Sequence, residues 1–159
     1  MKSRARWFFL FLLVLMPIAA RAEAQDDKTT LSKTFFDEYA AALSSLDPQR
    51  LLPYYHEPLT LITAPITSIL TTRADIEKWL KSRREQMKER GYARNAWDQL
   101  HVKQLNYGLA VASALAVRYK GDGRELDRLG ITYVLRRTGD GWKIVVLTVH
   151  DPDTVLRLE

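Results

Sequence analysis

The first half of the chain alternates between helical and strand periodicities. Apolar residues recur in steps of three and four through residues 31–46, which places them on one stripe and predicts an amphipathic helix. Asp47 is a favourable N-cap and Pro48 suits the first helical position, so a second, short helix is expected over residues 48–55. The stripe of the first helix consists of Leu31, Phe35, Tyr39, Leu43 and Leu46.

Two short strands and a third helix are expected next. Residues 59–63 and 66–71 are rich in β-branched side chains, and Ala64-Pro65 forms the bend between them. The third helix is expected over residues 73–90, between a threonine cap and Gly91. Its apolar stripe consists of Ile76, Trp79, Leu80 and Met87.

The second half of the chain predicts four consecutive strands. They are separated by short turns, of which Gly139-Asp140-Gly141 is the strongest hairpin signal because these residues tolerate a positive φ. Strands joined in this way form an antiparallel meander, and the three helices must cover one of its faces. The expected strands span residues 99–106, 109–119, 126–137 and 142–150.

Two of these strands are apolar on both faces. The strand over 109–119 carries alanines on one face and mostly leucine and valine on the other, and residues 144–149 are apolar on both sides. Such runs are typical of strands that are covered on both faces. Helices can cover only one face here, so the pattern predicts a homodimer through the outer face of the sheet. The alternative is an outer face that is apolar and uncovered.

The N-terminal segment has the three parts of a secretory signal peptide. A basic start precedes an apolar run of 14 residues, which is shorter than the roughly 20 residues that span a bilayer, and small residues follow. Cleavage is expected after Ala22 or Ala24, and the alternative is a short uncleaved anchor. The mature protein is then periplasmic or secreted, with no stable membrane anchor. The predicted organisation is a signal peptide (1–22), a flexible lead-in (23–30), one domain (31–151) and a C-terminal tail (152–159).

The export prediction changes the meaning of the net charge. The 159 residues carry a formal charge of +5, but four basic groups and no acidic group lie in residues 1–22. The remainder has 20 basic and 19 acidic residues, a net charge of +1, so nucleic-acid binding is not expected. The basic end of the third helix suits a helix C-terminus and is expected to be solvated. Its residues, with one just beyond, are Arg83, Arg84, Lys88, Arg90 and Arg94.

Composition and motifs exclude several classes of chemistry. The chain contains no cysteine, which excludes a disulfide framework, cysteine-ligated metals and a cysteine nucleophile. The glycine-rich dinucleotide and phosphate loops and the serine-hydrolase elbow are absent. The spacing of the three histidines matches no zinc pattern. No cofactor and no metal are therefore expected.

Three segments carry a resemblance to a known superfamily: Phe-Phe-Asp-Glu-Tyr at 35–39, Leu-Asp-Pro-Gln-Arg-Leu-Leu-Pro-Tyr-Tyr at 46–55, and Gly-Asp-Gly-Trp-Lys-Ile at 139–144. With the order of elements, they resemble the nuclear transport factor 2-like superfamily, which includes ketosteroid isomerase, scytalone dehydratase and SnoaL-type cyclases. The resemblance implies an α+β, cystatin-like fold, in which a curved antiparallel sheet wraps around N-terminal helices to form a cone with an internal pocket. Many members have no catalytic activity, so activity must be argued from the site.

Enzymes with this fold place a carboxylate or a histidine inside the cone, where it moves a proton. The expected strand interiors contain no carboxylate. His150 ends the last strand on the face of Ile144, and it is the best candidate for a proton donor or acceptor because imidazole titrates near neutral pH. His56, near the mouth of the cone, and His101, at the start of a strand, are further pocket candidates. The alternative for each is a structural position.

Aromatic side chains are the remaining candidates for the pocket lining. They suit a flat, apolar ligand better than a sugar or nucleotide, and the alternative is ordinary core packing. The leading hypothesis is an exported domain that holds a small apolar molecule. The alternatives are an isomerase, dehydratase or cyclase that uses His150 with a tyrosine donor, Tyr39 or Tyr55, and a protein-interaction module acting through the outer sheet face. The aromatic candidates are Tyr39, Tyr55, Trp79, Trp97 and Tyr133.

Overall fold

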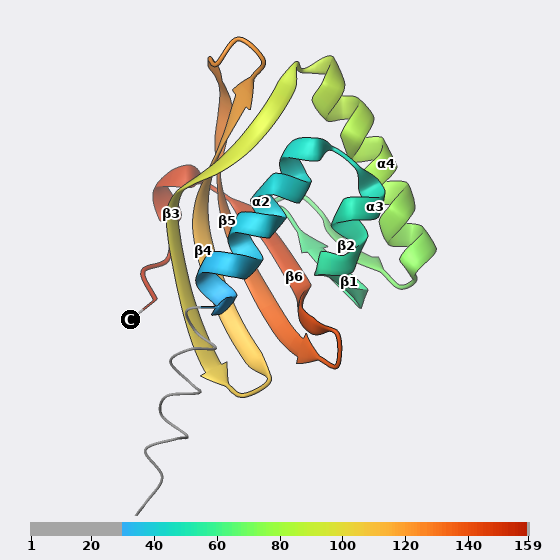
Figure 1. Cartoon of the computed structure of the whole chain (residues 1–159), viewed down its shortest axis with the longest axis vertical. Coiled ribbons are helices and arrows are strands. Elements are labelled where there is room, and N and C mark those ends of the chain that lie inside the picture. Colours follow the sequence, from blue (N-terminus) through green and yellow to red (C-terminus); the bar gives the residue numbers. More distant parts are fainter. Residues whose placement is uncertain (1–29, 159) are drawn as a thin grey trace, which may run out of the picture.

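A six-stranded curved sheet wraps around the helices in the computed structural model, which describes residues 30–158 (Figure 1). The strand order is β2-β1-β6-β5-β4-β3. The predicted signal peptide and nearly all of the lead-in lie outside the described residues. The elements are η1 (Thr30–Phe35), α2 (Phe36–Ser45), α3 (Pro48–Leu51), η2 (Leu52–Tyr54), β1 (Tyr55–Ile62), β2 (Thr67–Leu70), α4 (Arg73–Glu89), β3 (Tyr92–Asn106), β4 (Leu109–Lys120), β5 (Glu125–Thr138), β6 (Gly141–His150) and η3 (Pro152–Thr154).

The predicted α+β, cystatin-like architecture is confirmed, with changes at two strands. β1 begins at Tyr55 rather than residue 59, and β3 begins at Tyr92 rather than residue 99. The other departure is the pairing of β1 with β6, which is parallel, whereas the remaining neighbours in the sheet are antiparallel. Hydrophobic periodicity reports side-chain alternation and not the direction of a distant partner, so it could not reveal this pairing.

The alanine face of β4 forms the floor of the core. The side chains of Ala110, Ala112, Ala114 and Ala116 are at most 1% exposed. Small residues on this face let α2 pack close to the sheet, and α2 fills the space with the fully buried rings of two aromatic residues. These residues are Phe36 and Tyr39.

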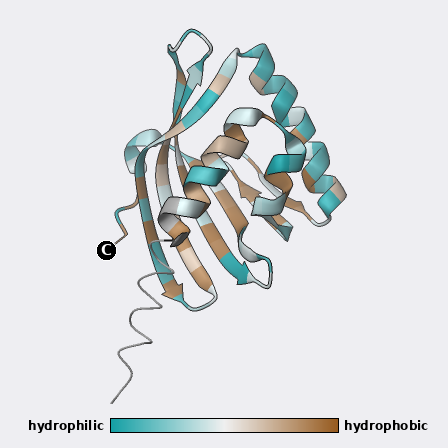
Figure 2. Cartoon of the chain, in the orientation of Figure 1, coloured by the Kyte–Doolittle hydropathy of each residue, from teal (hydrophilic) through white to brown (hydrophobic). Residues whose placement is uncertain are grey.

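α4 covers the neighbouring part of the inner face. Its N-terminus is a capping box, in which the Thr72 hydroxyl accepts a hydrogen bond from the Asp75 N–H and the Asp75 carboxylate accepts one from the Thr72 N–H. Ile76, Leu80 and Met87 are buried, and the outward side of the helix is hydrophilic (Figure 2). Among residues 30–158, no helix is both long and apolar enough to cross a membrane.

A bulge in β6 changes which of its side chains face inward. Ile144 lies opposite Leu135, but the next partner of β5, Val134, lies opposite Val146, so Val145 is an extra residue. One extra residue shifts every following side chain to the other face of a sheet. Leu147 therefore lies on the inner face with Ile144, although regular alternation would place residues three apart on opposite faces.

The C-terminal segment crosses the outer face of β4. The Leu156 N–H donates a hydrogen bond to the Ser113 hydroxyl at 2.9 Å, and Pro152 and Val155 flank a shallow hollow with Leu115. Ser113 and Leu115 are buried in the single chain. The chain's own tail thus covers part of the outer face for which the sequence predicted a second subunit.

Candidate functional site

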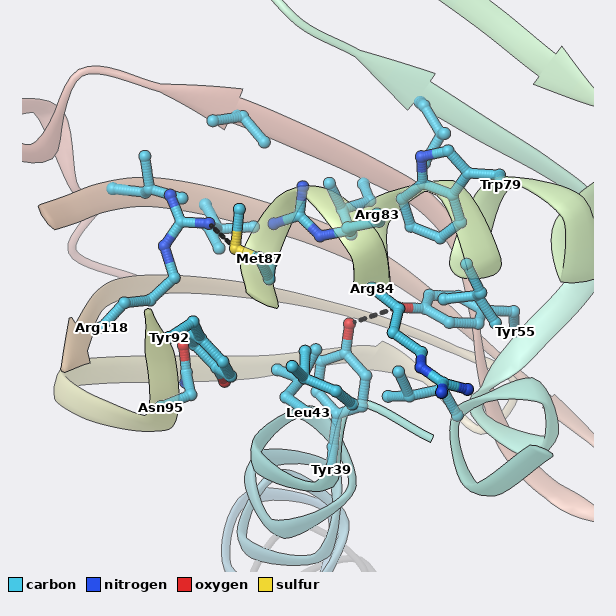
Figure 3. Close-up of a pocket in the computed structure, with 18 of the residues that line it drawn as sticks. Tyr39, Leu43, Tyr55, Trp79, Arg83, Arg84, Met87, Tyr92, Asn95 and Arg118 are labelled. Carbon is cyan, nitrogen blue, oxygen red and sulfur yellow. Dashed lines mark hydrogen bonds between the residues drawn. The ribbon is translucent and has the colours of Figure 1, made fainter. Parts of the chain in front are cut away.

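A cavity of about 140 Å³ lies between the inner face of the sheet and helices α2 and α4 (Figure 3). Its walls are mostly apolar, with side chains such as Leu43, Leu61, Ile131 and Leu147. No aspartate, glutamate or histidine occurs among the described residues that line it. An engineered apolar cavity of about 150 Å³ can hold benzene, so this space suits a ligand built on a single ring.

Two buried tyrosines meet at the wall of the cavity. The hydroxyl groups of Tyr39, from α2, and Tyr55, from the start of β1, are 2.7 Å apart and hydrogen-bonded (Figure 3). The ring of Tyr133 packs edge-to-face against Tyr39, with 6.0 Å between centroids. With Tyr92, four wall positions are therefore aromatic rings that carry a hydroxyl group.

Burial holds these tyrosines in their neutral form. It raises the pKa of Tyr55 to about 12, while the hydrogen bond with Tyr39 opposes the rise. Burial also raises the pKa of Tyr39 and of Tyr133 well above the ordinary value for tyrosine. At neutral pH the hydroxyl groups can donate and accept hydrogen bonds, but they do not act as anions.

Three arginines line the cavity, and their charges come from two opposite walls. Arg83 and Arg84 lie on α4, between the buried Leu80 and Met87, and Arg118 projects from β4. Arg118 is only 6% exposed and is held by two hydrogen bonds to the Asp127 carboxylate. Burial lowers the pKa of Arg118, and the contact with Asp127 opposes this effect. The guanidinium also donates to the sulfur of Met87 at 3.2 Å (Figure 3).

Four of the eight predicted pocket residues line the cavity: Tyr39, Tyr55, Trp79 and Tyr133. Trp97 lies behind the wall in the core. Its indole N–H donates to the Phe36 carbonyl at 2.9 Å, and its ring stacks on Tyr39 with 6.2 Å between centroids.

The three histidines do not line the cavity. His150 was expected to share a face with Ile144, but the bulge at Val145 places it on the outer face, opposite Gly130. Its Nε2 lies 3.0 Å from the Thr132 hydroxyl and its Nδ1 lies 3.0 Å from the hydroxyl of Thr154. These contacts tie β5 to the C-terminal segment.

The other two histidines lie outside the cavity at different places. His101 pairs with Ser113 in the β3–β4 ladder, on the outer face. His56 follows Tyr55 in β1, and its Nδ1 is buried without a hydrogen-bond partner among the described residues. Within residues 30–158, no three His, Asp or Glu side chains gather at a geometry that could hold a metal.

The arginines are the lining residues that sequence reasoning missed. Arg83 and Arg84 were expected on a solvated face, but both are half-buried because they continue the buried stripe from Leu80 to Met87. Their spacing of three and four from Leu80 contained this signal. Arg118 lies two residues after the buried Ala116, on the same face of β4, so the alternation along this strand held the signal for an inward arginine.

Comparisons with solved structures support the fold. An NTF2-like protein with a cystatin-like fold from Novosphingobium aromaticivorans has a TM-score of 0.69 and 18% identity, over 86% of this chain and 89% of that one. A domain of unknown function with a cystatin-like fold from Nostoc punctiforme has a TM-score of 0.61 and 17% identity, over 78% and 76%. An NTF-2-like protein of unknown function from Shewanella oneidensis has a TM-score of 0.62 and 14% identity, over 80% and 99%. At these identities the likeness shows the fold alone.

Comparison at the level of sequence gives the family. No curated protein matches the chain. Residues 26–152, which include the whole helical layer and all six strands, match one described family. The predicted resemblance to the nuclear transport factor 2-like superfamily is confirmed: the chain belongs to the NTF2-like protein family DUF6841.

Proposed function

We propose that this protein is an exported binding protein that holds a small apolar ligand in the cavity between its sheet and helices. The observation that carries the proposal is the cavity itself, which is mostly apolar and is lined by three buried tyrosine rings. Removing apolar ligand surface from water supplies the driving force, at roughly 25 cal/mol per Å². The tyrosine hydroxyls, including the Tyr39–Tyr55 pair, orient a ligand by hydrogen bonds.

The lining favours binding over proton-transfer catalysis. A general acid or base works best with a pKa near the operating pH. The ionisable groups in the wall are arginines and tyrosines, and burial raises the pKa of Tyr39, Tyr55 and Tyr133. The enzyme alternative through His150 requires its imidazole in the cavity, whereas this side chain bonds to Thr132 and Thr154 on the outer face.

Native mass spectrometry of the protein purified from its own periplasm tests this function. We expect a retained small molecule, and we expect Leu147→Trp to abolish its retention by filling the cavity. Leu105→Trp is the matched control, because Leu105 is exposed on β3 and does not line the cavity. Absence of any retained molecule, or equal retention in Leu147→Trp, would contradict the proposal.

We also propose that the protein forms a homodimer through the part of the outer face that its tail leaves open. Side chains of five strands form one row across this face, as the ladder pairings define it. Ile69 at one end of the row is 63% exposed. The row consists of Ile69, Thr60, Val146, Val134 and Val111.

Sedimentation velocity at micromolar concentration tests the dimer. We expect a dimer for the native protein and a monomer for Val134→Lys, which places a charge within the row. Lys103→Glu, at the β3 edge of the same face, is the control and should remain dimeric. A native protein that is only monomeric overturns the dimer. A stable complex with a different polypeptide would instead support an interaction module.

A further inference from the structure

We propose that the ligand carries a carboxylate or a similar small oxyanion and that Arg83 binds this group inside the cavity. The inference rests on the proposed function and adds the chemical class of the ligand: an apolar body with one acidic group.

The first observation is the unpaired charge of Arg83. Its side chain is half-buried at the cavity wall, and no hydrogen bond or ion pair to it is found among residues 30–158. The other two lining arginines differ, since Arg118 is bound by Asp127 and Arg84 lies 3.4 Å from Glu85. A cation withdrawn from water without a partner lowers the stability of the folded chain. A ligand carboxylate would supply the missing partner.

The second observation is the sign of the charges around the cavity. Three arginines line it, and no carboxylate occurs among the described lining residues. Asp127, which contacts the lining Arg118, accepts hydrogen bonds from both Arg118 and Arg90 and is therefore already engaged. The charge of Arg83 acts on Arg118 and on the tyrosines, where it lowers the pKa of Tyr39, Tyr55 and Tyr133 against the larger effect of burial. Arg83 therefore lies within electrostatic reach of Arg118 and of these three tyrosine hydroxyl groups.

The third observation is a free donor on the facing strand. The Nδ2 of Asn95 is buried and has no hydrogen-bond partner among the described residues. Asn95 lies opposite Arg118 in the β3–β4 ladder, and both residues line the cavity. Its backbone N–H is bound by the Ser44 hydroxyl at 3.0 Å, which fixes the strand beside α2. A buried donor without a partner costs free energy unless a ligand oxygen accepts from it.

The close-up view shows how these groups lie. Arg83 reaches from α4 and Arg118 from the sheet, with the Met87 side chain between them, while Asn95 lies below Arg118 (Figure 3). Trp79 and Tyr55 lie at the opposite end of the same cavity (Figure 3). We place the apolar body of the ligand beside Trp79 and Tyr55, and its acidic group beside Arg83, Arg118 and Asn95. An oxyanion between a guanidinium and an amide forms charge-assisted hydrogen bonds.

A matched pair of probes tests the acidic group. Isothermal titration at pH 7 compares benzoate with benzamide, which has nearly the same shape but no charge. We expect the native protein to bind the acid at least about tenfold more tightly than the amide, as one charge-assisted hydrogen bond provides. Arg83→Gln should abolish this preference. Asn95→Asp should weaken binding of the acid relative to the native protein, because it places a negative charge beside Arg118.

The control removes a charge from the same helix outside the cavity. Lys78 is exposed on α4 and does not line the cavity, so Lys78→Gln should keep the preference for the acid. Binding of the amide without a preference for the acid overturns the anion site and leaves the cavity proposal standing. A preference that survives Arg83→Gln also overturns it. If neither probe binds, the anion site is overturned, and native mass spectrometry decides the cavity proposal separately.

Discussion

Arg118 and Asp127 lie directly opposite each other in the β4–β5 ladder, and two hydrogen bonds join the guanidinium to the carboxylate. The Nη2–Oδ2 distance is 2.8 Å. Arg118 is 6% exposed, whereas the Asp127 side chain is 22% exposed and also pairs with Arg90. This pair places a buried cation at the wall of the cavity and neutralises it there, which leaves Arg83 as the lining arginine without a partner among the described residues.

We expect Asp127→Asn to lower the free energy of unfolding by about 3 kcal/mol, because it leaves the buried Arg118 without its counter-charge. Urea unfolding at pH 7 measures the change. Asp122→Asn is the matched control, since Asp122 pairs with the exposed Arg124 and solvent screens an exposed pair. Equal losses in the two variants would contradict a special role for the buried pair.

Replacing Arg83 by methionine should leave the protein as stable or raise its free energy of unfolding by about 0.5–1 kcal/mol, because an unpaired half-buried cation is exchanged for apolar volume. Thermal and urea unfolding both report this change. Arg118→Met provides the contrast and should be destabilising, since it removes the two hydrogen bonds from the buried guanidinium to Asp127 and leaves that carboxylate paired with the more exposed Arg90. A loss of more than about 1 kcal/mol for Arg83→Met would mean that Arg83 has a structural partner in the fold.

Gly130 admits the imidazole of His150. A Cβ atom at this position would overlap with the ring and with the Asp151 carbonyl oxygen. We expect Gly130→Ala to lower the free energy of unfolding by about 1–3 kcal/mol, as overpacking does. Gly139→Ala is the control, because a Cβ atom there meets nothing within 4 Å. The variants are compared by urea unfolding, and equal stability would show that His150 moves freely.

The buried tyrosines predict a loss of stability at alkaline pH. The pKa of Tyr55 is about 12 in the folded chain, mainly because of burial, against about 10 when unfolded. A raised folded pKa contributes stability that is complete below pH 10 and is lost as the pH rises through 12. Tyr39 and Tyr133 act in the same direction.

The midpoint of urea unfolding should therefore fall as the pH rises from 9 to 12. In the folded protein, the tyrosinate absorbance at 295 nm from the buried tyrosines should appear at a higher pH than that from exposed tyrosines. Tyr107→Phe is the control for titration, because Tyr107 is 78% exposed. Tyr55→Phe should reduce the alkaline loss. An early rise in absorbance from the folded protein, beyond what the exposed tyrosines supply, would contradict the burial effect.

Export predicts a defined mature N-terminus. Intact-mass analysis of the periplasmic protein should find a chain that begins at Glu23 or Gln25, after cleavage behind Ala22 or Ala24. Ala22→Leu together with Ala24→Leu should block processing, because the cleavage site requires small residues. An unprocessed, cytoplasmic native chain would overturn the prediction.

Local patterns in the sequence were sufficient for the order of elements and for half of the predicted pocket. Two local signals depend on neighbouring residues alone. Apolar residues in steps of three and four, ending at Asp47-Pro48, predicted α2 and α3, and the Gly139-Asp140-Gly141 turn predicted the β5–β6 hairpin. Tyr39 and Tyr133 were found for the same reason, since each lies at an apolar position of its own element.

The remaining features depend on contacts between distant parts of the chain. The extra residue at Val145 moves His150 to the outer face, and a bulge is defined by the register with β5 rather than by any local pattern. The tail covers Ser113 because Leu156 returns to it across 43 residues. The convergence of Arg83 and Arg118 required α4 and β4 to be packed against one another. Periodicity says which side of an element is buried, and only tertiary packing decides what that side meets.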